Sequence, residues 1–372
     1  MKNTYLACAE INLDALKHNI QEIQAVLGDT KLMCVIKTNA YGHGAVVLAR
    51  ELAAMGAYGF AVATVDEGIE LRNNGIIQPI LVLGFVAKEQ YADMITHHIM
   101  PAIFTYSMAK DFDAVASSMH TVADVHIKLD TGMSRIGFKS DEESVDATVQ
   151  GIVMINSLLK NIRIDGIFTH FATADEADDS KFKRQLSFFT DLVDNLTDRP
   201  RLVHASNSAT SIWHAATVFN TVRLGVVIYG LNPSGSVLDL PYNIRPALSL
   251  ETALVHVKTL PAGQDVGYGA TYTTTADEVI GTIPIGYADG WTRDLQGFHV
   301  IVDGQLCPIV GRVSMDQITV RLPKVYPLGT PVTLMGENGG ASITATEVAE
   351  KRGTINYEVL CLLSDRVPRS YD

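Results

Sequence analysis

The stretch Leu32–Gly44, LMCVIKTNAYGHG, decides the fold, because it joins an apolar run directly to a cluster of polar residues. Leu32–Ile36 has no polar alternation, which is typical of a strand buried on both faces. On its N-terminal side, Leu13–Leu27 repeats apolar residues every three or four positions and stops at Gly28, which predicts a helix. On its C-terminal side, His43–Met55 predicts a second helix.

The same alternation of apolar run and helical pattern continues along the chain. Further strands are expected at Gly59–Ala63, Ile80–Gly84, Met100–Phe104, Val125–Leu129, Ile164–Phe171, Leu202–Ala205 and Val222–Tyr229. Helical patterns lie between most of them, for example at Lys88–His98, Met108–Met119 and Ser180–Leu196. Eight such units predict a (β/α)8 TIM-like barrel of the α/β class. A doubly wound sheet is the alternative, and the count of eight favours the barrel.

The pattern changes near residue 245, where helices give way to β-branched runs broken by glycines. These runs are Thr252–Lys258, Glu278–Ile285, Phe298–Val302, Ile318–Arg321 and Pro331–Leu334. Asn232–Pro246, which contains three prolines, is the expected link. We therefore predict a barrel domain over residues 1–244 and a mostly β C-terminal domain over residues 245–372.

Composition excludes several functional classes. The chain has 372 residues, 47% of them hydrophobic, and a formal charge of −12. An acidic surface without a basic cluster repels nucleic acid and anionic lipid. No apolar run approaches the length of a membrane helix. Glu10 and Asp14 interrupt the apolar patch near the N-terminus, so we expect a cytoplasmic protein without a signal peptide.

The cysteines and short motifs add no metal or disulfide chemistry. Cys8, Cys34, Cys307 and Cys361 are scattered and form no C-x-x-C pair, so neither a zinc cluster nor a disulfide framework is expected. Asp130-Thr131-Gly132 has the letters of an aspartic protease site but no second copy, and that mechanism needs two carboxylates.

Polar side chains that can do chemistry cluster near the ends of the predicted strands, and these ends converge on one face of a barrel. The residues are Lys37, Lys128, Asp130, Arg135, His170, His204, Ser208 and Arg223, the last with Gly225 two positions further on. Lys37 directly follows the first strand. Burial lowers the pKa of a lysine, which suits covalent attachment of a carbonyl cofactor. The alternative is an amine that reaches solvent, and the convergence of five strand ends argues against it.

Eight segments, in order, resemble the alanine racemase family of fold type III pyridoxal-phosphate (PLP) enzymes. They are IKTNAYGHG (36–44), IKLDTGMSRIGF (127–138), HASNSA (204–209), RLGVVIYG (223–230), GYGATY (267–272), PIGYADG (284–290), GRVSMDQ (311–317) and INYEVL with RVPRSY (355–371). Together they cover nearly the whole chain and both predicted domains.

The resemblance implies roles for individual residues. Lys37 would carry PLP and act as one base, and Tyr268 would be the other, on the opposite face of the substrate Cα. Arg223 would meet the pyridine nitrogen, with His170 and His204 holding it. The phosphate would be held by Tyr41, Ser208, Gly225, Val226 and Tyr357.

The resemblance also implies how substrate and partner bind. Arg135 and Met315 would meet the substrate carboxylate, Asp316 would support the site, and Tyr287 would narrow its entrance. Lys128 would be carbamylated and hold Arg135. The family further implies a homodimer in which Tyr268, Tyr287, Met315 and Asp316 serve the partner's site. The expected activity is interconversion of L- and D-alanine, which supplies D-alanine for cell-wall peptidoglycan.

Ser314, Thr38 and Cys361 depart from the residues most common in the family. They leave open a serine racemase or one of broad specificity as an alternative. A PLP-binding homeostasis protein without catalysis is more remote, because such proteins resemble only the barrel. A PLP decarboxylase would place a glutamate, not Arg223, at the pyridine nitrogen.

Overall fold

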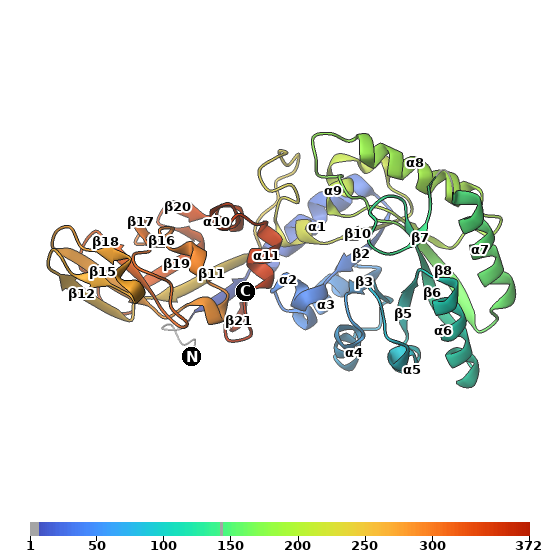
Figure 1. Cartoon of the computed structure of the whole chain (residues 1–372), viewed down its shortest axis with the longest axis horizontal. Coiled ribbons are helices and arrows are strands. Elements are labelled where there is room, and N and C mark those ends of the chain that lie inside the picture. The colour runs from blue at the N-terminus through green and yellow to red at the C-terminus, as the bar shows by residue number, and fades with distance from the viewer. Residues whose placement is uncertain (1–6, 142–143) are drawn as a thin grey trace.

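A computed structural model describes residues 7–141 and 144–372, and one part of it, on the right in Figure 1, is a nearly closed barrel of parallel strands. The barrel strands pair in the order β10-β2-β3-β4-β5-β6-β8-β9. Their bounds are β2 Lys31–Val35, β3 Gly59–Val62, β4 Ile80–Val82, β5 Ile99–Ile103, β6 Ala123–Asp130, β8 Ile162–Phe168, β9 Leu202–His204 and β10 Thr221–Leu224. All eight strands expected from the sequence are present, so the predicted barrel is confirmed.

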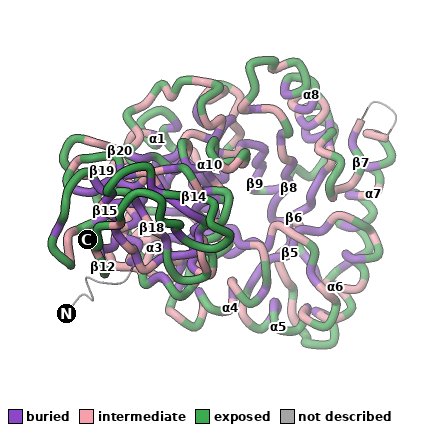
Figure 2. Tube along the Cα trace, turned by 60° about the vertical axis from the view of Figure 1, so that its left-hand side comes forward, coloured by how far each residue is buried: buried purple, intermediate pink, exposed green. Residues whose placement is uncertain are grey.

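Helices cover the outside of the barrel. They are α1 Leu13–Leu27, α3 Ala45–Ala54, α4 Val65–Asn73, α5 Tyr91–Thr96, α6 Tyr106–Ser118, α7 Val145–Leu158, α8 Ser180–Asp194 and α9 Ser208–Trp213. Each turns its apolar stripe inward, and Figure 2 shows the barrel strands buried inside a more exposed outer layer. A short strand, β7 Phe138–Lys139, pairs with the end of β6.

Only the first half of one predicted strand is extended. The run Val222–Tyr229 stays extended to Leu224 and then turns at Gly225 into a 3-10 helix, η3 Val226–Tyr229. Its residues are apolar because they are buried, and burial alone does not distinguish a strand from a short helix.

The C-terminal part is mostly β, as predicted, and holds three sheets. The largest is ordered β17-β16-β19-β11-β1-β21, with β20 beside β19. Its strands are β1 Cys8–Ile11, β11 Leu248–Ala253, β16 His299–Val302, β17 Gln305–Pro308, β19 Pro331–Asn338, β20 Ala341–Ile343 and β21 Arg369–Tyr371. The smaller sheets combine β12 His256–Leu260, β15 Glu278–Ile283 and β18 Ile318–Leu322, and β13 Asp265–Val266 with β14 Tyr272–Thr273.

The first strand of the described residues lies in this C-terminal sheet. β1 pairs antiparallel with β11 and parallel with β21, so residues 8–11 cross the boundary predicted at residue 245. The division into two domains stays a proposal.

Two helices of the C-terminal part were not expected from the sequence, namely α10 Ala345–Arg352 and α11 Asn356–Cys361. In Figure 1, α11 lies between the barrel and the β-rich part. Within the described ranges, none of the helices has both the length and the apolarity needed to cross a bilayer.

Candidate active site

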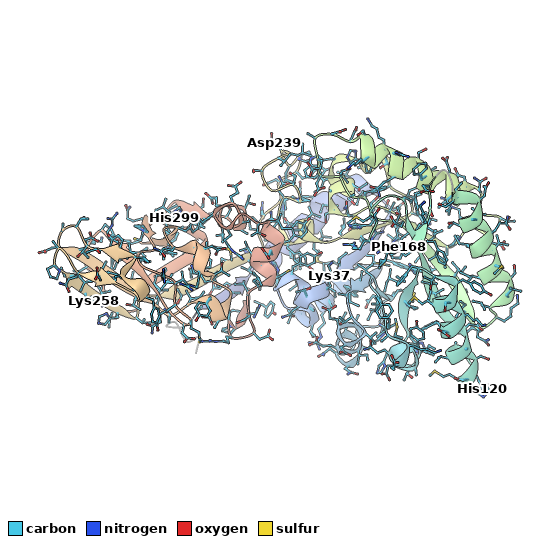
Figure 3. The ribbon with its side chains drawn as sticks, in the orientation of Figure 1. Lys37, His120, Phe168, Asp239, Lys258 and His299 are labelled. Atoms are coloured by element: carbon cyan, nitrogen blue, oxygen red, sulfur yellow. The ribbon has the colours of Figure 1, made fainter. Side chains whose placement is uncertain are left out.

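A cavity of about 610 Å³ opens where the carboxyl ends of the barrel strands meet α11. Figure 3 shows Lys37 where the barrel approaches the C-terminal part, and Phe168 further inside the barrel. The cavity brings together ten of the residues named from the sequence: Lys37, Tyr41, Lys128, Arg135, His170, Ser208, Arg223, Gly225, Val226 and Tyr357. His204 is buried behind Arg223 and contacts it directly.

Lys37 follows the end of β2 after one residue, Ile36, and is half-buried at the cavity wall. Burial lowers the pKa of its amine, and the positive charge of Arg135 lowers it further. A larger share of the amine is then neutral near pH 7, which is the form that can attack a carbonyl or take a proton.

The segment after Lys37 has an uncommon backbone. Thr38, Asn39, Ala40 and Tyr41 have φ values of 54°, 51°, 53° and 53°, so they form a left-handed turn without a glycine. Each such residue costs about 1–2 kcal/mol. The Thr38 N–H donates to a carboxylate oxygen of Glu67 at 2.6 Å, and the Asn39 side chain accepts from Ala45 N–H at 2.8 Å. These bonds hold the turn that carries Lys37 and Tyr41.

A group of hydroxyl and backbone donors lies at one end of the cavity. Ser208 Oγ accepts from the Gly225 N–H at 2.9 Å, and the ring centroids of Tyr41 and Tyr357 are 6.1 Å apart. A Cβ on Gly225 would lie 2.8 Å from the Tyr41 hydroxyl, so a side chain there would crowd this end. Burial raises the pKa of both tyrosines, so their phenols stay neutral donors. Neutral donors around a glycine suit an anionic phosphate.

Arg223 is buried and donates from both terminal nitrogens. One, Nη1, lies 2.8 Å from His204 Nδ1, and the other, Nη2, lies 3.3 Å from His170 Nδ1. Nη2 also donates to the Thr169 and Ala205 carbonyls at 2.8 and 3.0 Å. An arginine has no acceptor, so both histidine Nδ1 atoms must be unprotonated. A cation fixed this way can donate to an unprotonated pyridine nitrogen.

Lys128 lies beside Arg223, on the inward face of β6. Its amine is 5.3 Å from the centre of the Phe168 ring, and the Arg223 guanidinium is 5.2 Å from the same ring. Burial lowers the pKa of Lys128 to about 7, with further lowering by Arg223, Arg135 and Lys37. A cavity lined by these cations favours an anionic ligand.

These groups fit PLP by their chemistry: an amine of lowered pKa, phosphate donors around Gly225, and a fixed arginine for the pyridine nitrogen. Among residues 7–141 and 144–372, no group of three or more His, Cys, Asp and Glu side chains is arranged to hold a metal ion.

Four residues named from the sequence lie outside this cavity, on the C-terminal part. Tyr268, Tyr287 and Met315 are 73%, 42% and 52% exposed. Asp316 is exposed and pairs with Arg366 at 2.6 Å. The cavity of a single chain therefore contains Lys37 but not Tyr268.

Residues of this region that were missed at the sequence level include Phe168 and Asp175, which line the cavity, and His126, which contacts His204. A signal for His126 was present. On β6, His126, Lys128 and Asp130 alternate with Val125, Ile127 and Leu129, and period-two alternation puts the polar set on the inner face.

Comparisons with known proteins match nearly the whole chain. The family models for the alanine racemase N-terminal and C-terminal domains match residues 11–233 and 247–371. An alanine racemase of Streptococcus thermophilus is 67% identical over 98% of this chain and 97% of its own length. The crystal structure of alanine racemase from E. faecalis superimposes with a TM-score of 0.94 at 44% identity, covering 100% of both chains. A histidine racemase of Leuconostoc mesenteroides has a TM-score of 0.93 at 32% identity, with 100% and 99% coverage.

Proposed function

The chain belongs to the alanine racemase family, and from that premise we propose that Lys37 and the partner subunit's Tyr268 are the two bases that interconvert L- and D-alanine. The activity is that of a PLP-dependent isomerase, and its product, D-alanine, serves cell-wall peptidoglycan. The 67% identity to an alanine racemase supports alanine over other amino acids, whereas the histidine racemase has the same fold at 32%.

Racemisation requires a proton to leave Cα on one face and another to arrive on the opposite face. PLP, when bound, draws electrons from Cα and so makes its proton removable. Lys37 takes or returns the proton on its own side of the cavity. Tyr268 does the same from the opposite side.

The remaining residues bind and orient. Tyr41, Ser208, Tyr357 and the backbone of Gly225 and Val226 would hold the phosphate. Arg223 would donate to the pyridine nitrogen, because it stays protonated at working pH. His170 and His204 would keep the guanidinium in place.

Arg135, which lines the cavity, would bind the substrate carboxylate. Lys128 is proposed to carry a carbamate, formed when its neutral amine bonds to CO₂ and releases a proton. The carbamate would be an anion that attracts Arg135, whereas a charged amine there would repel it.

The exposure of Tyr268 is the observation that supports an active site built from residues of two chains. A base that is 73% exposed and outside its own chain's cavity needs a cavity on another chain. A homodimer supplies two such sites, and Met315, Tyr287 and Asp316 would enter the partner's cavity with it. The cytoplasmic location stays a prediction.

Mixing two inactive variants tests this arrangement. Lys37→Ala and Tyr268→Ala subunits, mixed in equal amounts, should recover about a quarter of wild-type activity, because half of the dimers are mixed and each has one intact site of two. The matched control mixes Tyr268→Ala with the double variant Lys37→Ala/Tyr268→Ala, which yields no intact site. Sites built from one chain would give no recovery in either mixture, despite subunit exchange.

A further inference from the structure

A chain of buried side chains extends from Arg223 away from the cavity. His204 Nε2 lies 2.8 Å from His126 Nδ1, while His204 Nδ1 faces Arg223. Both histidines have no exposed surface, and neither lines the cavity. His126 Nε2 in turn faces Asp165 at 4.0 Å, and Arg201 binds both oxygens of Asp165 at 2.9 and 2.7 Å.

The hydrogen bonds fix a direction along this chain. Arg223 can only donate, so His204 Nδ1 accepts, and a neutral His204 must carry its proton on Nε2. That N–H donates to His126 Nδ1, which leaves the His126 proton on Nε2. Among the described residues this last N–H has no hydrogen-bond partner, and it points to the Asp165 carboxylate.

The local structure leaves space for the His126 ring. A Cβ on residue 166 would lie 2.4 Å from His126 Nδ1, so only glycine fits there. The pairing of β6 with β8 shifts register between Val125 and His126, which brings Gly166 opposite the ring. Phe168 stacks on His204 with ring centroids 4.8 Å apart and planes at 6°. Both rings are therefore held on more than one side.

We propose that His126 is a positioning residue for the reaction: its Nδ1 selects the His204 tautomer that can accept from Arg223, and Asp165 supports it by attracting the Nε2–H. Without His126 Nδ1 as an acceptor, both neutral tautomers of His204 are unfavourable. His204 can keep a buried Nε2–H without a partner, or move the proton to Nδ1 and turn a donor toward the Arg223 donor. The first choice leaves a buried donor unpaired and is therefore costly, so part of the population takes the second, which breaks the bond from Arg223 and loosens the guanidinium. This role rests on the proposed function in one respect, that Arg223 serves the cofactor ring.

The matched variants are His126→Asn and His126→Leu. The Asn oxygen can occupy the position of His126 Nδ1, whereas Leu has nearly the same size and no acceptor. Both remove the rest of the ring, so the cavity that they leave is similar. His126→Gln is a second variant without an acceptor at that position, in case His126→Leu does not fold.

The direct measurement is the ¹⁵N spectrum of the His204 ring in the holoenzyme and after cofactor removal, assigned through a His204→Gln variant. Wild type and His126→Asn should show one protonated and one unprotonated nitrogen. In His126→Leu and His126→Gln the two His204 shifts should move toward each other. In the same two variants the absorbance of bound PLP should change. Their kcat/KM should fall roughly tenfold, which is the effect expected from the loss of one buried hydrogen bond.

An unchanged His204 spectrum in both variants that lack the acceptor would overturn the proposal. A changed spectrum with unchanged PLP absorbance and kcat/KM would also overturn it, because His126 would then not act through Arg223. The His204 spectrum of the protein without cofactor does not depend on alanine racemisation. A protein that does not racemise alanine would therefore contradict the proposed function, while the spectrum would still test whether His126 sets the His204 tautomer.

Discussion

Lys128 shows how the barrel interior controls the charge of a single side chain. It is 5% exposed, lies over Phe168 and has Arg223, Arg135 and Lys37 as positive neighbours. Such surroundings favour any form of the amine that is not cationic. The consequence is measurable in the stability of the protein without cofactor.

In CO₂-free buffer, Lys128→Gln should raise the free energy of unfolding at pH 6.5 by about 3 kcal/mol, and by much less at pH 9.5. The pKa of Lys128 is about 7 in the folded chain against an ordinary value of 10.5, so the folded state binds fewer protons between these values. Stability of the wild type therefore rises with pH across this window, and the substitution removes the rise. Urea unfolding at both pH values measures it.

Bicarbonate provides the control for this prediction. A carbamate on Lys128 removes the cation, so the pH dependence of the wild type should flatten when bicarbonate is added. Equal pH dependence of wild type and Lys128→Gln in CO₂-free buffer would mean that burial does not lower the pKa of the Lys128 amine.

The sequence was informative about single residues wherever a polar side chain followed an apolar strand. Lys37 was found this way, and it lines the same cavity as Arg223, which was named within the eighth expected strand. His126 was missed because its partners come from other strands: His204 follows it by 78 positions. A hydrogen bond between distant strands leaves no local pattern, although the alternation on β6 was a usable sign.

At the scale of elements, the left-handed turn after Lys37 is the feature that local propensity explains least. Four consecutive residues other than glycine have positive φ, and Thr38, which is β-branched and exposed, is the least suited of them. The fold retains the turn because it presents Lys37 and Tyr41 to the same cavity.

Thr38→Gly should therefore raise the free energy of unfolding by about 1 kcal/mol in the protein without cofactor. Glycine adopts this conformation without strain and keeps the N–H that donates to Glu67. Thr38→Ala is the control, because alanine removes the branched side chain but not the strain at positive φ. Denaturant unfolding should rank glycine above alanine, and the reverse order would mean that the turn is not strained at Thr38.

The turn at Gly225 leads to a prediction about binding. Gly225→Ala should weaken PLP binding roughly tenfold or more, since the added Cβ lies 2.8 Å from the Tyr41 hydroxyl and crowds the phosphate donors. Gly151→Ala on α7 is the matched control, because among the described residues an added Cβ would have no atom within 4 Å apart from its chain neighbours and the nearby backbone of its own helix. Equilibrium dialysis of PLP measures both variants, and equal affinities would remove Gly225 from the phosphate site.

The boundaries of an element could be predicted where an apolar pattern repeated over several turns. They could not be predicted where packing against other elements determines the structure. The helix Leu13–Leu27 was predicted to the residue, because its apolar stripe repeats over several turns. The short helix α11 has six residues, too few for a periodic signal. It takes its place from packing against the barrel, where it delivers Tyr357.

At the scale of the whole molecule, the first and last strands of the described residues lie in the same sheet. Ile11 pairs with Leu248 on β11 and with Tyr371 on β21. No sequence pattern indicated this pairing, because a four-residue strand has little periodicity and its partners are distant. The proposed C-terminal domain is incomplete without that strand.

A fragment of residues 247–372 should consequently fold poorly, since the edges of β11 and β21 that bind β1 would be unpaired. Residues 7–12, joined to residue 247 through an Asn-Gly turn, should restore a cooperative thermal transition. The connection is short because Asn12 N–H donates to the Ala247 carbonyl at 2.8 Å. Equal transitions in the two fragments would show that the C-terminal domain is independent of β1.

The position of β1 also sets an order of events during synthesis. Cys8–Ile11 leaves the ribosome before the barrel strands, but its partner β11 follows about 240 residues later, which is roughly 10–50 s at cellular translation rates. During that time the barrel can close while both hydrogen-bonding edges of β1 remain unpaired. Its brevity and the charge of Glu10 limit pairing with strands of other nascent chains. A ribosome that stalls within the last hundred codons would therefore hold a finished barrel beside an unfinished sheet.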